Sequence, residues 1–283
     1  MAAVAASQTA MTAIASSQTA MAAVAASYVA VAAVYGSAVA VDAVKANETA
    51  WATLAGATSA VMGKAVAVLS GLNPDSYADM TAVASSSTAM AAIIANSTAL
   101  NAVVSSSAAM SAVAASQTAR AAIEKSQVAK DAIAASDMAT AKYAVGTAGL
   151  KPADYANMAA VAASQTAMAA VASSQTAMAA IAASSTALSA IAASTTALDA
   201  LYAKKKRMSG ASASLSGKFI ILQISNDNAF DTSQYGYATL SDGSKPNWGS
   251  YKDKYAYFKQ YKKIATYMKN DTDSNDWIDY FQC

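Results

Sequence analysis

The sequence begins with three variants of one ten-residue unit: residues 1–10 read MAAVAASQTA, residues 11–20 read MTAIASSQTA and residues 21–30 read MAAVAASYVA. Each unit, or decad, places alanine third, valine or isoleucine fourth, serine seventh and alanine last. The unit loses its phase after Gly56, resumes at Met80 and fades again before Met158, where a third run begins. A short unit repeated over most of the chain predicts a repetitive array rather than one globular core.

The residues that vary between decads are spaced as on one face of a helix. Alanine and methionine are strong helix formers, and serine is a favoured N-cap residue. In a helix that begins after Ser7, the variable residues Gln8, Thr12 and Ser16 form an exposed stripe opposite an apolar patch. A continuous helix would advance about 1000° per decad, roughly 80° short of three turns, so that patch would drift around the axis.

We therefore expect a mainly α repeat array of short, N-capped helices that bend at each serine and stack as a solenoid or fibre. One long helix is the first alternative. Coils of a β-solenoid with ten residues per coil are the second, although alanine is depleted in strands.

A longer repeat interrupts the decads twice. Residues 71–80 read GLNPDSYADM, and residues 149–158 read GLKPADYANM. Glycine commonly follows the end of a helix, and proline suits the first turn of the next one. These elements divide the repeat region, residues 1–203, into three blocks at 1–70, 71–148 and 149–203.

The composition removes several classes of chemistry. The chain is 55% apolar but only 13% charged, against roughly 25% in an average soluble protein. It contains no histidine, which excludes histidine metal ligands, Ser-His-Asp triads and histidine acid–base catalysis. The only cysteine is Cys283, and a net charge of +2 does not indicate a nucleic-acid partner. We expect no enzymatic activity and no cofactor.

The composition changes at Lys204, because all four phenylalanines and most tyrosines follow it. We expect a basic and Ser/Gly-rich linker over residues 204–216 and a small mainly-β or α+β domain over residues 217–283. Runs of β-branched and aromatic residues predict its strands at 218–225, 234–240, 255–258, 263–268 and 277–281, with a helix as the alternative for 255–258.

The decads of residues 7–35, 80–120 and 158–202 resemble those of tail-fibre-like proteins of bacteriophages and prophages. The order of parts is also similar: decads, a Leu-Tyr-Ala-Lys-Lys-Lys junction at 201–206, Ser-Gly-Lys at 216–218, and an aromatic region ending in cysteine. The resemblance implies an extended fibre, commonly trimeric, with a terminal receptor-binding tip. It implies no catalytic residues.

Aromatic residues of the C-terminal region are the candidates for receptor binding, because aromatic faces stack on sugars and anchor protein interfaces. For any single residue of the set, a place in the core of a small domain is the favoured interpretation. Trp248 is the strongest candidate, since Pro246, Asn247 and Gly249 place it on a loop. The full set is Tyr235, Tyr237, Trp248, Tyr251, Tyr255 and Tyr257.

An acidic stretch near the C-terminus offers a weaker metal site. Asp271, Asp273 and Asn275 alternate as the first ligands of an EF-hand loop do. The pattern then departs from that loop, because Asp276 replaces the required glycine and Gln282 the bidentate glutamate. A solvated acidic loop is the favoured interpretation.

The sequence thus favours a structural and adhesive tail-fibre-like protein, whose repeat shaft presents a receptor-binding domain to the bacterial surface. The expected partners are a surface glycan or outer protein and further copies of the chain, as a homotrimer or by self-association through the repeat. We expect no nucleic acid and no membrane insertion. The resemblance implies the virion or the extracellular surface as the location. The sequence shows no signal peptide or transmembrane segment.

Two other functions stay open. An ice-binding or other surface-lattice protein is the first, because threonine recurs every ten residues. Val29 and Val39 interrupt that threonine row, however. A polysaccharide-degrading fibre tip is the second, and it would need an acidic pair among Asp227, Asp231 and Asp242.

Overall fold

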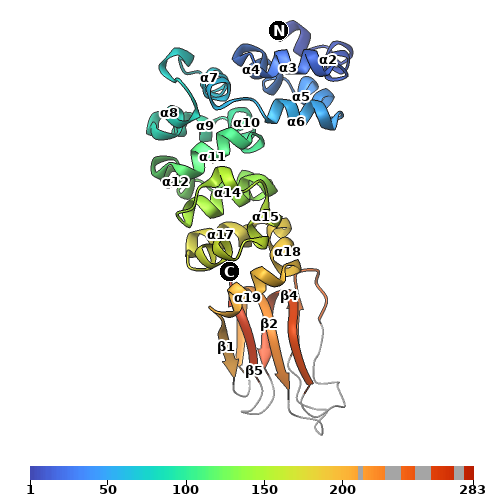
Figure 1. Ribbon diagram of the computed structural model, residues 1–283, viewed down its shortest axis with the longest axis vertical. Coiled ribbons are helices and arrows are strands. Elements are labelled where there is room, and N and C mark those ends of the chain that lie inside the picture. The colour runs from blue at the N-terminus through green and yellow to red at the C-terminus, as the bar shows by residue number, and fades with distance from the viewer. Residues whose placement is uncertain (210–212, 227–236, 246–255, 271–276) are drawn as a thin grey trace. The chain divides into compact units, whose positions relative to one another are not determined.

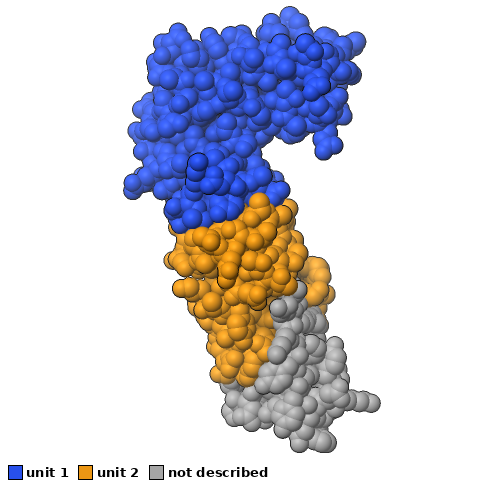
Figure 2. All heavy atoms as spheres, viewed as in Figure 1, with its two compact units in different colours: residues 1–157 blue, residues 158–283 orange. Residues whose placement is uncertain are grey.

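The computed structural model describes residues 1–209, 213–226, 237–245, 256–270 and 277–283. The chain folds into two compact units, Met1–Asn157 and Met158–Cys283 (Figure 2). The first unit consists of helices, and the second joins the last decad helices to a β-sheet (Figure 1). The predicted fold class, a helical repeat array followed by a small β region, is confirmed.

Short α-helices follow one another through both units, nearly all of them one to a decad. Those of the first unit are α1 (Ala2–Ala5), α2 (Gln8–Ala15), α3 (Gln18–Ala25), α4 (Tyr28–Tyr35), α5 (Ala38–Lys45), α6 (Glu48–Ala55), α7 (Ser59–Leu69), α8 (Met80–Ser85), α9 (Ser87–Ala95), α10 (Ser97–Ser105), α11 (Ser107–Ala115), α12 (Gln117–Glu124), α13 (Gln127–Ala134) and α14 (Asp137–Thr147). Those of the second are α15 (Met158–Ala163), α16 (Gln165–Ala172), α17 (Gln175–Ala183), α18 (Ser185–Ala193) and α19 (Thr195–Tyr202).

Serine side chains cap most of these helices, as the sequence predicts, and Asn47, Thr58, Asp79 and Asn96 cap others. The Ser17 hydroxyl accepts a hydrogen bond from the Ala20 amide at 3.3 Å, which satisfies one of the free N–H groups at the start of α3. The backbone bends sharply at each cap: by 102° between α3 and α4 and by 106° between α9 and α10. Neither one long helix nor a series of β-coils describes the array.

The helices wind into a superhelix. Within each run of decads, a helix packs against the helix three further along, as α2 does on α5, α9 on α12 and α16 on α19. Since successive helices are bent by about a right angle, three decads complete roughly one superhelical turn. The first and fourth residues of the decad fill the interior: Met11, Met21 and Val34 are fully buried. Alanine elsewhere lets backbones of adjacent turns approach closely.

The two Gly-Leu-x-Pro elements end the longest helices, α7 and α14. Gly71 has φ +70° and Gly149 φ +81°, the left-handed conformation that glycine adopts at a helix C-terminus. The Leu72 amide donates to the Ala67 carbonyl at 2.8 Å, which completes a Schellman motif. A 3-10 turn follows each glycine, η1 (Pro74–Ser76) and η2 (Pro152–Asp154). Glycine thus follows the end of a helix in both elements, and proline begins a 3-10 turn.

Five antiparallel strands form the sheet of the second unit. They are β1 (Lys206–Ser209), β2 (Ala213–Asn226), β3 (Tyr237–Leu240), β4 (Ala256–Asn270) and β5 (Trp277–Gln282), in the order β1-β5-β2-β4-β3. One face carries a core that includes Phe219, Ile221, Ile278 and Met268. β4 joins the two strands that we expected at 255–258 and 263–268.

The segment expected as a linker requires a correction. Residues 206–209 form β1 and residues 213–216 begin β2, so both pair within the sheet. Serine and alanine are tolerated there because the backbone is hydrogen-bonded to neighbouring strands, as Ser214 is opposite Lys269. Met208 is buried on the core face, which fixes β1 in register with β5.

Candidate functional site

The sheet register brings three strand ends together. Asn226, the last residue of β2, pairs with Ala256, the first of β4. The preceding residue, Ser225, pairs with Trp277, the first of β5. The chain continues from these adjacent ends into residues 227–236, 246–255 and 271–276, which lie outside the described residues.

Most of the expected site residues belong to those segments. Tyr235, Trp248, Tyr251 and Tyr255, and the acidic group Asp271, Asp273 and Asn275, lie outside the described residues. The backbone of Tyr237 lies in β3 and that of Tyr257 in β4. Tyr237 pairs with Lys269 and Tyr257 with Ser225, so the two lie toward opposite ends of β4. The register does not place these two tyrosines side by side.

An ion pair between the partly exposed Arg207 and the buried Asp279, which was not predicted, joins β1 and β5. The Arg207 guanidinium donates to both carboxylate oxygens of Asp279, from Nε to Oδ1 at 2.6 Å and from Nη2 to Oδ2 at 2.8 Å. The Asp279 side chain has no exposed surface, and Lys205 Nζ lies 3.8 Å from its Oδ2. A bidentate contact to a buried carboxylate fixes both strands, and removal of one partner alone is costly.

Aromatic rings lie against the cations of this pair. The Arg207 guanidinium is 3.7 Å from the centre of the Trp277 ring, and Lys205 Nζ is 3.7 Å from the centre of the Tyr202 ring. The prediction of a basic linker over residues 204–216 missed this packing. The signal that indicates it is an aspartate at the centre of an otherwise apolar strand, Trp-Ile-Asp-Tyr-Phe, because a buried carboxylate needs a cation.

The last decad helices hold the sheet directly. The Tyr202 hydroxyl, at the end of α19, donates to the Gln223 side-chain oxygen in β2 at 2.9 Å. The Lys218 ammonium donates to the Ala182 carbonyl near the end of α17, where the helix dipole favours a cation. α18 also packs on β4 and α19 on β5. The sheet and the final turn of the array therefore form one body.

An open cavity of about 350 Å³ lies between α18 and the turn after β3. Ser189, Ser241, Asp242 and Lys263 supply its polar groups. The Ser244 hydroxyl and amide both donate to Asp242, which lowers the pKa of its carboxyl. This places one carboxylate and one ammonium at the cavity, without a second described carboxylate beside them to serve as an acid–base pair.

Cys283 ends the chain beside β2, where its amide donates to the Lys218 carbonyl at 3.0 Å. Burial raises the pKa of its thiol to about 12, and Lys218 opposes this shift only in part. The thiol is protonated at neutral pH and is therefore a poor nucleophile and a poor metal ligand.

Within the described ranges, no three His, Cys, Asp or Glu side chains are grouped as a metal site would require. No single helix among those residues is long and apolar enough to cross a membrane. Four pairs of consecutive helices have the necessary length and hydropathy when taken together, but the two helices of each pair are bent by at least 90°. No protein-family model and no curated protein matches the chain.

Proposed function

We propose that the protein is a structural and adhesive component, in which the helical array holds the C-terminal sheet toward a bacterial surface receptor. The proposal follows the resemblance of the decads to those of tail-fibre-like proteins. It places the protein on a virion or another extracellular surface, with a surface glycan or outer protein as its partner.

The attachment of the sheet to the decad helices carries this proposal. A binding module needs a support that does not move independently, and Tyr202–Gln223 and Lys218–Ala182 join helix to strand at two separate points. The Arg207–Asp279 pair ties β1, the strand that directly follows α19, into the same sheet. A ligand bound to the sheet region would thus be connected to the last decad helices, α17 and α19, without a hinge between them.

The adjacent ends of β2, β4 and β5 indicate where the proposed receptor-binding surface would lie. Residues 227–236, 246–255 and 271–276 are all joined to adjacent ends of β2, β4 and β5. They include Trp248 and Tyr251, whose side chains suit stacking on a sugar ring or anchoring in a protein pocket. We assign receptor binding to this part of the chain.

Binding of the fluorescently labelled full chain to a panel of bacterial strains tests the proposal. We expect strain-selective binding that Trp248→Ala weakens by about tenfold or more, as for an aromatic hot spot. Trp51→Ala, a tryptophan in α6, is the matched control and should bind as the unchanged chain does. Binding to none of the strains, or equal loss in both variants, would contradict the proposal.

A further inference from the structure

Some N-cap serines also donate a hydrogen bond to a backbone carbonyl of the preceding superhelical turn. The Ser37 hydroxyl donates to the Ala5 carbonyl at 2.6 Å, and the Ser116 hydroxyl to the Ala84 carbonyl at 2.7 Å. In both cases the acceptor lies 32 residues earlier, near the end of a helix in the preceding turn. The same side chains accept the capping bond of their own helix. Each such serine thus satisfies a helix start and a helix end at once.

The junction at Asn47 lacks this bond. Asparagine replaces the decad serine there, and its Oδ1 accepts the capping bond from the Ala50 amide at 3.0 Å. By the same spacing its amide nitrogen should donate to the Ala15 carbonyl. Among the described residues, however, no hydrogen bond joins these two groups or reaches either of them. A buried or half-buried polar group without a protein partner needs water or a ligand.

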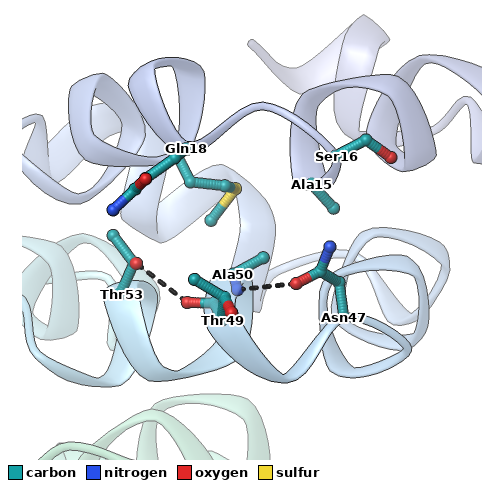
Figure 3. A pocket seen from close by; sticks show the side chains of 8 residues that line it. Ala15, Ser16, Gln18, Asn47, Thr49, Ala50 and Thr53 are labelled. Atoms are coloured by element: carbon teal, nitrogen blue, oxygen red, sulfur yellow. Dashed lines mark hydrogen bonds between the residues drawn. The ribbon is translucent and has the colours of Figure 1, made fainter.

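A cavity of about 210 Å³ occupies this position, between the α2–α3 junction and α6. Figure 3 shows the Asn47 amide nitrogen pointing from α6 toward Ala15 and Ser16, with Gln18 at the other side of the opening. The lining residues are Ala15, Ser16, Gln18, Met21, Asn47, Thr49, Ala50 and Thr53.

The lining selects a class of ligand. Two carboxamides and three hydroxyl-bearing residues supply the polar groups, and Met21 and two alanines supply an apolar surface. None of these eight residues is charged, so an ion would lose hydration without gaining a counter-charge. The volume is smaller than the roughly 300–1,000 Å³ of pockets for drug-sized ligands. Neutral ligands that combine hydroxyl groups with an apolar ring face, and are no larger than one sugar ring, match it.

The geometry points to a binding site for a single neutral sugar residue between α2, α3 and α6. A sugar hydroxyl bridges Asn47 Nδ2 and the Ala15 carbonyl, which takes the place of the serine bond seen at Ser37, Ser116, Ser136 and Ser194. A second hydroxyl bonds the Gln18 carboxamide across the opening. This site lies in the first unit and is independent of the receptor binding assigned to the sheet region.

Asn47→Ser provides the sharpest test, because it restores the decad consensus. Serine also caps helices well, so α6 should persist, while its hydroxyl reaches Ala15 as Ser37 reaches Ala5. We titrate the full chain with methyl β-glucoside, methyl β-galactoside and N-acetylglucosamine, and follow the side-chain amide signals of Asn47 and Gln18 by NMR. At least one sugar should shift both signals saturably, and Asn47→Ser should abolish the shift at Gln18.

Asn96→Ser is the matched control. Asn96 is also an N-cap, but its amide already donates to the Leu69 carbonyl at 2.8 Å, so the variant should bind sugar unchanged. Gln18→Ala, at an exposed position, should weaken binding by about three- to tenfold without disturbing the fold. Two results would overturn the inference. The first is that none of the sugars shifts the Asn47 amide signal, so that the cavity holds only water. The second is that a sugar shifts the Gln18 signal equally in Asn47→Ser.

Discussion

Buried hydroxyls differ in whether they have a partner, and this difference sets their contribution to stability. Tyr143 and Tyr35 are both buried in the first unit, at 2% and 6% exposure. The Tyr143 hydroxyl donates to Glu124 Oε1 at 2.5 Å. The Tyr35 hydroxyl has no hydrogen-bond partner among the described residues, although the ring packs edge-on against Trp51. Burial raises the pKa of both phenols.

Tyr35→Phe should therefore stabilise the protein. It removes a buried hydroxyl that lost its water contacts on folding, and we expect the free energy of unfolding to rise by about 1 kcal/mol near neutral pH. Above about pH 10 the Tyr35 phenol ionises in the unfolded chain, whereas its raised pKa keeps it protonated in the folded one. The free energy of unfolding therefore falls as the pH rises, and it should fall less in Tyr35→Phe, which has no phenol at this position. Urea titrations at neutral and alkaline pH measure both effects.

Tyr143→Phe is the control for this change. It deletes a hydrogen bond to a carboxylate and should destabilise the chain by about 1–3 kcal/mol. Equal destabilisation by the two variants would show that the Tyr35 hydroxyl has a partner in solution.

At the scale of elements, the two Gly-Leu-x-Pro connectors have similar backbones, but the lysine of the preceding helix contacts each of them differently. Lys142, in α14, is buried at 1% exposure and donates to the Pro152 and Tyr155 carbonyls at 3.1 and 3.2 Å. Burial lowers the pKa of Lys142, and the Asp154 carboxylate opposes that shift. Lys64 holds the equivalent place in α7 but forms an exposed ion pair with Asp75 at 3.3 Å.

Lys142→Met should loosen its connector, because it leaves two carbonyls without a donor. We expect a loss of about 1–3 kcal/mol and faster amide exchange over residues 149–157. Lys64→Met removes an exposed ion pair and a 5.6 Å contact with the Tyr28 ring, and should cost at most about 1 kcal/mol. Hydrogen–deuterium exchange of both variants measures the difference. Similar exchange in the two connectors would mean that the Lys142 contacts do not hold the chain.

The superhelix predicts a short distance between elements far apart in sequence. Thr12 in α2 and Asp42 in α5 are both exposed, and their helices are packed together. Packed helix axes lie about 8–10 Å apart, whereas a continuous helix would separate these residues by about 45 Å. Spin labels on Thr12→Cys and Asp42→Cys, in a chain with Cys283→Ser, should show strong dipolar broadening. A distance near 45 Å would contradict the superhelix.

At the scale of the whole molecule, local signals predicted more than long-range ones. The caps at Ser7 and Ser17 and the glycine stop at Gly71 follow from hydrogen bonds within a few residues, and sequence spacing indicates them. The bond from Ser37 to Ala5 depends on the path of a complete superhelical turn. The Arg207–Asp279 pair depends on strand order. Neither was predicted, since neighbouring residues do not encode which distant segment will be adjacent.

The expected binding residues illustrate the same limit. Trp248 and Tyr251 were proposed from their types and flanking residues, and they lie outside the described segments. The register adds what the sequence did not contain, namely that the segments holding them are joined to adjacent strand ends at Asn226, Ala256 and Trp277. It also places Tyr237 and Tyr257 toward opposite ends of β4, although the sequence had grouped them by residue type.

Hydrogen–deuterium exchange of the full chain, with and without cell-envelope fragments from a strain that it binds, tests the central claim most directly. Receptor binding by the sheet region predicts slower exchange after residue 204, centred on residues 227–236, 246–255 and 271–276, with the decad helices unchanged. Slower exchange confined to helices of the first unit, with none after residue 204, would contradict it.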